Sequence, residues 1–128
     1  MIIIIDLNLG NVGSIFNMFE KIGVASKISN NENDIQKAKK LILPGVGAFD
    51  SGIEKLKKNN LINSIEKKVL DKSTPILGIC LGMQMMLESS EEGEKKGLGW
   101  IKGKVIKFRD KNLKIPHMGW NKVIKTKN

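Results

Sequence analysis

The sequence has no tyrosine, one cysteine, one histidine and three prolines among its 128 residues. A single cysteine excludes an internal disulfide framework and a multi-cysteine zinc site, and it is typical of a protein of the reducing cytoplasm. The longest apolar run near the start, residues 2–5, is far too short to span a membrane. No secretory signal is visible either. We therefore expect a cytoplasmic protein without a membrane partner.

Acidic residues are scarce beside basic ones, with 13 Asp and Glu against 22 Lys and Arg and a net charge of +9. This balance suggests nucleic-acid binding, but Arg109 is the only arginine, the residue that usually makes bidentate contacts with bases and phosphates. The lysines are spread along the chain, and the four phenylalanines and two tryptophans supply few stacking surfaces. We interpret the lysines as a solvated surface and expect no nucleic-acid partner.

The pattern of apolar residues alternates between strand and helix. The length of the chain and its 41% hydrophobic content suit a single globular domain. Short apolar runs predict strands at residues 2–5, 24–28, 41–43 and 75–79. Helical spacing or polar helical segments occupy residues 12–22, 30–40, 50–72 with a break at Asn59-Asn60, and 81–87. This order predicts an α/β fold with a doubly wound, mostly parallel sheet.

The last third of the chain has a different pattern. Residues 88–96 form a charged segment that we interpret as a loop. Strand-like segments follow at residues 100–101, 105–108, 115 and 120–124. We expect this part to be more antiparallel than the first two thirds.

The motif Gly78-Ile79-Cys80-Leu81-Gly82 lies where a predicted strand meets a predicted helix. It has the form of a nucleophile elbow with sulfur in place of oxygen, in which glycines avoid collisions between β-carbons. The positive end of the helix favours the Cys80 thiolate, and the N–H of Leu81 is available to an oxyanion. The alternative is a small, inert cysteine at the end of a core strand. The two flanking glycines favour the nucleophile.

A second glycine-rich motif, Pro44-Gly45-Val46-Gly47, also follows a predicted strand. Ligands of parallel sheets lie at the carboxyl ends of strands, so this loop and the turns after Asp6 and Ile79 are expected to surround the site. The loop supplies a second oxyanion donor if it lies beside the elbow, and otherwise it is a flexible connection. His117 is the only histidine, and its position in the sequence does not place it beside Cys80.

Together these motifs resemble the class I glutamine amidotransferases and, within them, the glutaminase subunits of imidazole glycerol phosphate synthases. The resemblance covers nearly the whole chain and rests on segments 43–49, 78–84, 88–99 and 116–121. It implies a flavodoxin-like fold in which residues 1–128 form a single partial domain. The family's catalytic histidine and glutamate come from a later His-Pro-Glu segment that is absent from this sequence, so we expect a C-terminally truncated chain.

By this resemblance Cys80 is the catalytic nucleophile, which attacks the side-chain amide of glutamine and releases ammonia. The resemblance assigns the oxyanion hole to Val46, Gly47 and Leu81. It assigns contacts with the glutamine substrate to Gly45 and Gln84. No cofactor and no metal are implied.

The same resemblance implies a partner, a (β/α)₈-barrel cyclase subunit that receives the ammonia in a heterodimer. The cyclase makes imidazole glycerol phosphate in histidine biosynthesis, and Asn11, His117 and Trp120 would face it. Two alternatives stay open. One is a catalytically inactive truncated remnant that only binds the cyclase; the other is a paralogous amidotransferase that supplies ammonia for surface-sugar synthesis.

Overall fold

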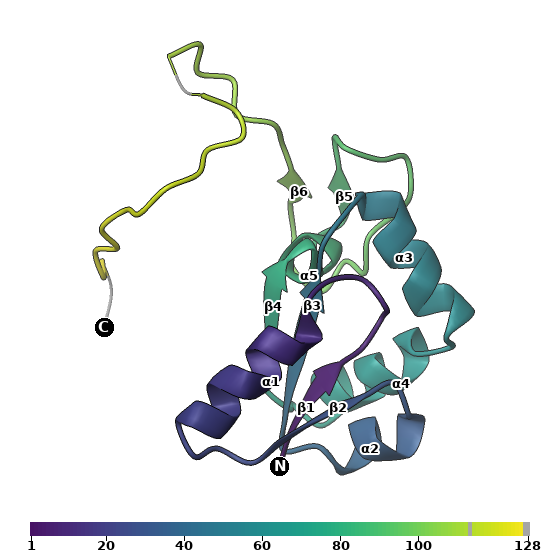
Figure 1. The fold of residues 1–128 in the computed structure, drawn as a ribbon. Helices are drawn as coiled ribbons and strands as arrows, with labels where there is room; N and C mark the ends of the chain where they lie inside the picture. The colour runs from purple at the N-terminus through teal and green to yellow at the C-terminus, as the bar shows by residue number, and fades with distance from the viewer. Residues whose placement is uncertain (113, 127–128) are drawn as a thin grey trace.

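The computed structural model describes residues 1–112 and 114–126, and its centre is a parallel four-stranded sheet in the order β2-β1-β3-β4 (Figure 1). The strands are β1 (Ile2–Ile5), β2 (Ser26–Ser29), β3 (Lys40–Gly45) and β4 (Ile76–Cys80). This strand order is the flavodoxin-like one, so the predicted doubly wound α/β fold is confirmed. The direction of winding reverses between β1 and β3, and the crevice beyond their carboxyl ends is where such sheets bind ligands.

Helices cover both faces of the sheet, with α1 on one side and α2, α3 and α4 on the other (Figure 1). Their bounds are α1 (Val12–Lys21), α2 (Glu32–Lys37), α3 (Phe49–Lys58) and α4 (Ile62–Glu66), followed by the π-helical turn η1 (Lys67–Asp71) and by α5 (Leu81–Met85). The predicted break at Asn59-Asn60 is present, because Asn60 adopts a φ of 54° between α3 and α4. None of the helices in the described residues is long and apolar enough to cross a membrane.

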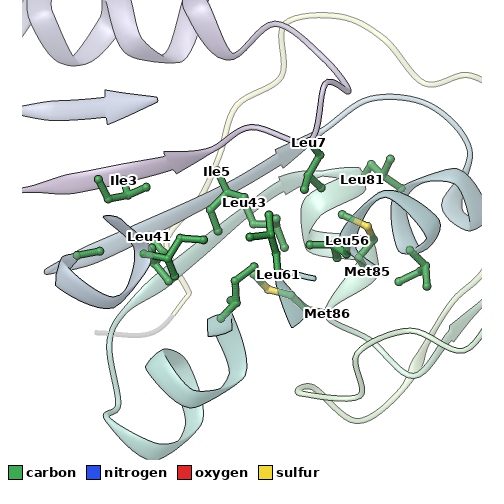
Figure 2. Close-up of a cluster of buried hydrophobic side chains, with 14 of the residues drawn as sticks. Ile3, Ile5, Leu7, Leu41, Leu43, Leu56, Leu61, Leu81, Met85 and Met86 are labelled. Carbon is green, nitrogen blue, oxygen red and sulfur yellow. The ribbon is translucent and has the colours of Figure 1, made fainter. Parts of the chain in front are cut away.

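The main core lies between the sheet and the face covered by α2, α3 and α4 (Figure 2). Ile3 and Ile5 of β1 point into it, whereas Ile4 is buried on the opposite face, as expected for a strand that is covered on both sides. The helix α1 contains no fully buried residue, and its predicted apolar stripe ends in an exposed Ile22. The two faces of the sheet are therefore covered unequally.

The predictions for the last third of the chain were largely wrong. Instead of four antiparallel strand-like segments, the described residues contain one short strand, β6 (Lys104–Val105), which pairs in parallel with β5 (Ser89–Ser90). β5 lies in the segment interpreted as a loop. Beyond β6 the chain leads away from the sheet and its helices (Figure 1). Apolar patterning produced no strand there because a strand also needs a neighbouring backbone with which to pair.

Asp34 joins α2 to the end of β2. Its Oδ2 accepts a hydrogen bond from the Oγ of Ser29 at 2.6 Å and forms an ion pair with the Nζ of Lys27 at 2.7 Å. The contact with Lys27 and then that with Ser29 lower the pKa of Asp34 below its ordinary value of 3.8. The ionised carboxylate is thus favoured in the folded state.

We expect the free energy of unfolding to fall as the pH drops below 3.8, and the Asp34→Asn variant to show a smaller fall. A depressed folded-state pKa stabilises the fold above the unfolded-state pKa, and this contribution is lost as the pH falls through the folded-state pKa. Chemical denaturation at a series of pH values measures the slope. Glu32→Gln, on the same helix, is the control for the change in net charge, and equal slopes in the two variants would contradict this role of Asp34.

Candidate active site

Cys80 is the last residue of β4, and α5 begins at the next residue, so the cysteine occupies the predicted turn between strand and helix. Its backbone has φ 53° and ψ −116°, a conformation that residues with a side chain rarely adopt. The residue is exposed rather than buried in the core. These features argue against an inert core cysteine, because such strain is retained chiefly at functional sites.

The flanking glycines have the steric role that the sequence predicts. A β-carbon at Gly78 would lie 2.6 Å from the backbone nitrogen of Met83. A β-carbon at Gly82 would lie only 1.7 Å from the carbonyl oxygen of Leu43, in the neighbouring strand β3. Both glycines are therefore needed for α5 to turn back so closely over β4 and β3.

The loop after β3 lies beside this turn. Gly45 pairs with Cys80 in the parallel register, and a β-carbon at Gly45 would lie 3.2 Å from the Cβ of Leu81. Val46 follows with 60% of its surface exposed, and Gly47 has a φ of +113°, which favours glycine. The structure thus brings the residues of the predicted oxyanion hole to one edge of the sheet.

The turn after β1 reaches the same edge. A β-carbon at Gly10 would lie 3.1 Å from the Cγ2 of Val46. Asn11 is the N-cap of α1, where its Oδ1 accepts a hydrogen bond from the N–H of Ser14 at 3.0 Å. The three turns expected at the carboxyl ends of the strands therefore lie together.

A cavity of about 760 Å³ opens beside Cys80 and Gln84. Its other walls come from the segment around β5, from the residues at and after β6, and from the chain near His117; they are Ser90, Glu91, Glu92, Val105, Ile106, Lys107, Phe108, Ile115, Pro116 and His117. Gln84, expected to contact the substrate, shares this cavity with the cysteine. His117 also lies along it, although its position in the sequence gave no reason to place it there.

His117 and Trp120, two of the predicted interface residues, lie in the segment beyond β6. The Nε2 of His117 lies 3.2 Å from the Nδ2 of Asn121. The side chain of Trp120 is fully exposed, at 105% of the reference surface. No group of three or more His, Cys, Asp or Glu residues in residues 1–112 and 114–126 is arranged to hold a metal ion.

Glu91 and Glu92 are cavity residues to which the sequence assigned no role, although residues 88–99 form one of the segments that carry the family resemblance. Glu91 accepts hydrogen bonds from the N–H of Lys107 at 3.0 Å and from Arg109 at 2.5 Å. The bond from Lys107, and then the Arg109 side chain, lower the pKa of Glu91 below its ordinary value. The cavity that Cys80 lines therefore also carries an ionised carboxylate. The signals in the sequence were the density of acidic residues and the resemblance of segment 88–99 to the family.

The arrangement combines an exposed thiol on a strained turn, backbone N–H groups from a second strand end, and an acidic cavity wall. A flavodoxin-like sheet with a strained turn between strand and helix defines a class of α/β proteins in which this turn presents a side chain at the edge of the sheet. Residues 3–128 match the family described as Glutamine amidotransferase class-I, and the chain belongs to that family.

Several curated proteins are similar to most of this chain. It is 58% identical over 124 residues to imidazole glycerol phosphate synthase subunit HisH 2 of Methanococcus maripaludis and 47% identical over 124 residues to the protein of the same name in Pseudomonas aeruginosa. It is 49% identical over 128 residues to subunit HisH of Sulfurimonas denitrificans. Each alignment covers 96% of this chain but 61% of the relative's length.

Proposed function

We propose that this protein hydrolyses glutamine through Cys80 and delivers the ammonia to a (β/α)₈-barrel cyclase that makes imidazole glycerol phosphate in histidine biosynthesis. Residues 1–128 form a single partial amidotransferase domain of this protein. The observation that carries the proposal is the strained, exposed Cys80 directly beside Gly45 in the register of β3 and β4. The names of the relatives, each a subunit of imidazole glycerol phosphate synthase, support the same activity.

The chemistry follows from the position of the sulfur. The Cys80 thiolate attacks the side-chain amide carbon of glutamine, and the amide oxygen becomes an oxyanion. Backbone N–H groups of Leu81, Val46 and Gly47 stabilise that charge. The carbon–nitrogen bond then breaks, ammonia leaves with an added proton, and water hydrolyses the thioester to glutamate and the free thiol.

The proton transfers need a base that takes the thiol proton and returns a proton to the leaving group. By the family resemblance this base is the histidine of a His-Pro-Glu segment, and residues 1–128 contain no such triplet. We do not assign this role to His117. In our proposal His117 belongs to the surface that binds the cyclase.

The polar ends of glutamine find partners in the same cavity. Gln84 lies one helical turn beyond Cys80, where its amide can hydrogen-bond the substrate, and the backbone of Gly45 lies on the other side of the elbow. The carboxylates of Glu91 and Glu92 suit the α-ammonium group of an amino acid. The volume of about 760 Å³ is ample for a substrate of this size.

The partner surface is proposed at Asn11, His117 and Trp120. An aromatic side chain that is fully exposed, like that of Trp120, is typical of an anchor that becomes buried in a complex. His117 connects this surface with the cavity of Cys80, because it lines that cavity and lies three residues before Trp120.

The proposal is tested with the protein as its gene encodes it, together with the barrel cyclase of the same organism. We expect the two to co-purify and to form glutamate from glutamine. Trp120→Ala is expected to weaken association by about 30-fold or more, the effect of losing a central aromatic anchor. Lys122→Ala on the same exposed segment is the control. Absence of glutamate formation in the complex would overturn the proposed activity, and unchanged binding by Trp120→Ala would overturn the proposed surface.

A further inference from the structure

Asp50, in the first turn of α3, binds a loop that lies more than 40 residues further along the chain. Its Oδ1 accepts a hydrogen bond from the N–H of Lys95 at 2.9 Å, and its Oδ2 accepts one from the N–H of Glu94 at 3.1 Å. These two bonds, that of Lys95 first, lower the pKa of Asp50 below its ordinary value. Each oxygen of one carboxylate thus holds one amide of the loop.

Gly93 allows this close approach. A β-carbon there would lie 2.1 Å from the Oδ1 of Asp50, so a side chain at position 93 would displace either the Asp50 carboxylate or the loop. Within the loop, the N–H of Glu92 donates to the Oγ of Ser90 at 3.1 Å, and the N–H of Gly93 donates to the carbonyl oxygen of Ser90 at 3.3 Å. Residues 90–93 therefore form a compact turn that leads directly into the two amides bound by Asp50.

One end of this connection lines the cavity of Cys80, and the other end lies near the elbow that carries the cysteine. On one side, Ser90, Glu91 and Glu92 line the cavity. On the other, Asp50 follows the buried Phe49 directly after the loop of Gly45 to Gly47. The start of α3 is itself close to α5, because a β-carbon at Gly52 would lie 2.5 Å from the Sδ of Met85. Asp50 contributes two hydrogen bonds that join the loop following the acidic wall to this assembly.

We propose that Asp50 is a positioning residue, which holds the acidic wall at residues 90–92 at the correct distance from Cys80 and thereby sets the affinity for glutamine. This inference rests on the proposed function. It assigns no contact between Asp50 and the substrate, since Asp50 does not line the cavity. Loss of the carboxylate leaves the thiol and its elbow intact and lets the wall move, so binding weakens more than the chemical step.

The test measures the alkylation of Cys80, by mass spectrometry, with two reagents. One is a chloroketone analogue of glutamine, whose labelling saturates if the cavity binds it; the other is iodoacetamide, which reports the reactivity of the thiol alone. For Asp50→Ala we expect the half-saturating concentration of the analogue to rise roughly tenfold. The limiting rate and the rate with iodoacetamide change less than about twofold.

Gly93→Ala gives an independent perturbation of the same contact. It is expected to raise the half-saturating concentration by about as much as Asp50→Ala, because its β-carbon meets the carboxylate. In the double variant the collision partner is absent, so the combined effect stays near tenfold instead of reaching about a hundredfold. Asp50→Asn keeps one acceptor oxygen and restores part of the affinity. This variant and Gly93→Ala carry the test if Asp50→Ala does not fold.

Glu54→Gln is the matched control, since it removes the exposed ion pair between Glu54 and Lys95, at 3.1 Å, on the same helix and loop. We expect it to change the half-saturating concentration less than about twofold. Saturable labelling of the wild type that is unchanged in Asp50→Ala and Gly93→Ala overturns the positioning role alone. Equal changes with both reagents, or additive effects in the double variant, overturn it as well. Wild-type labelling that does not saturate overturns the proposed function and this role together.

Discussion

Replacing Cys80 by alanine is expected to reduce glutamine hydrolysis by at least about 10³-fold, because the proposed thioester forms on the sulfur of Cys80. The residual rate would come from substrate binding and oxyanion stabilisation alone. Cys80→Ser is expected to be nearly as inactive, since a hydroxyl is much less readily ionised than a thiol. Release of glutamate by the complex with the cyclase is the measurement, and binding of the cyclase should be unchanged.

At position 80, the side chain that activity requires is expected to lower the stability of the fold. Cys80 has a φ of 53°, and such conformations cost a residue with a side chain about 1–3 kcal/mol. Cys80→Gly should therefore be inactive yet more stable than the wild type by about 1 kcal/mol, after allowing for the extra entropy of glycine in the unfolded chain. Glutamine hydrolysis by a Cys80→Ala variant would contradict the role of Cys80 as the nucleophile. A Cys80→Gly variant less stable than the wild type would contradict the backbone strain at this position.

Gly82→Ala is expected to be the most damaging small substitution in the fold. Its β-carbon would lie 1.7 Å from the carbonyl oxygen and 2.6 Å from the carbonyl carbon of Leu43, which are backbone atoms of the central sheet. α5 would have to move away from β3 and take the cysteine turn with it. Overpacking of this kind costs about 1–3 kcal/mol or more, which exceeds the gain of about 1 kcal/mol from alanine's higher helix propensity.

Gly13→Ala in α1 is the matched control for this prediction. Its β-carbon would have no neighbour closer than the Oδ1 of Asn11 at 3.5 Å, an ordinary contact. The variant should therefore be stabilised by roughly 0.5–1 kcal/mol. Urea denaturation compares the two variants. The steric argument fails if Gly82→Ala is as stable as Gly13→Ala.

Features that depend on neighbouring residues, such as the glycines around Cys80, could be predicted from the sequence. The spacing of Gly78 and Gly82 around Cys80 encodes a local requirement, because a tight turn between strand and helix leaves no room for β-carbons. The predicted β1, α1, β3 and β4 were found for the same reason: each run of apolar residues records which face of its own element is buried.

Contacts between residues that lie far apart in the sequence could not be predicted in this way. In the sequence, Asp50 does not differ from other acidic residues at the start of a helix. Glu91 and Glu92 belong to a charged segment interpreted as a loop. Asp50 binds residues that lie 44 and 45 positions further along the chain, and Glu91 binds residues 16 and 18 positions further along. The strand-like segments after β6 failed for a related reason, since their hydrophobic pattern could not indicate whether a partner strand lies beside them.

The sequence by itself determined the order of strands and helices as far as α5, the parallel α/β class and the turn that presents Cys80, because each depends on residues that are neighbours along the chain. Only the tertiary structure decided which walls enclose the thiol, that the acidic segment at residues 90–92 is one of them, and that Asp50 binds the adjoining amides of Glu94 and Lys95. Those features depend on how closely α3 and α5 pack against the sheet. That distance is set jointly by many side chains, and no local pattern records it.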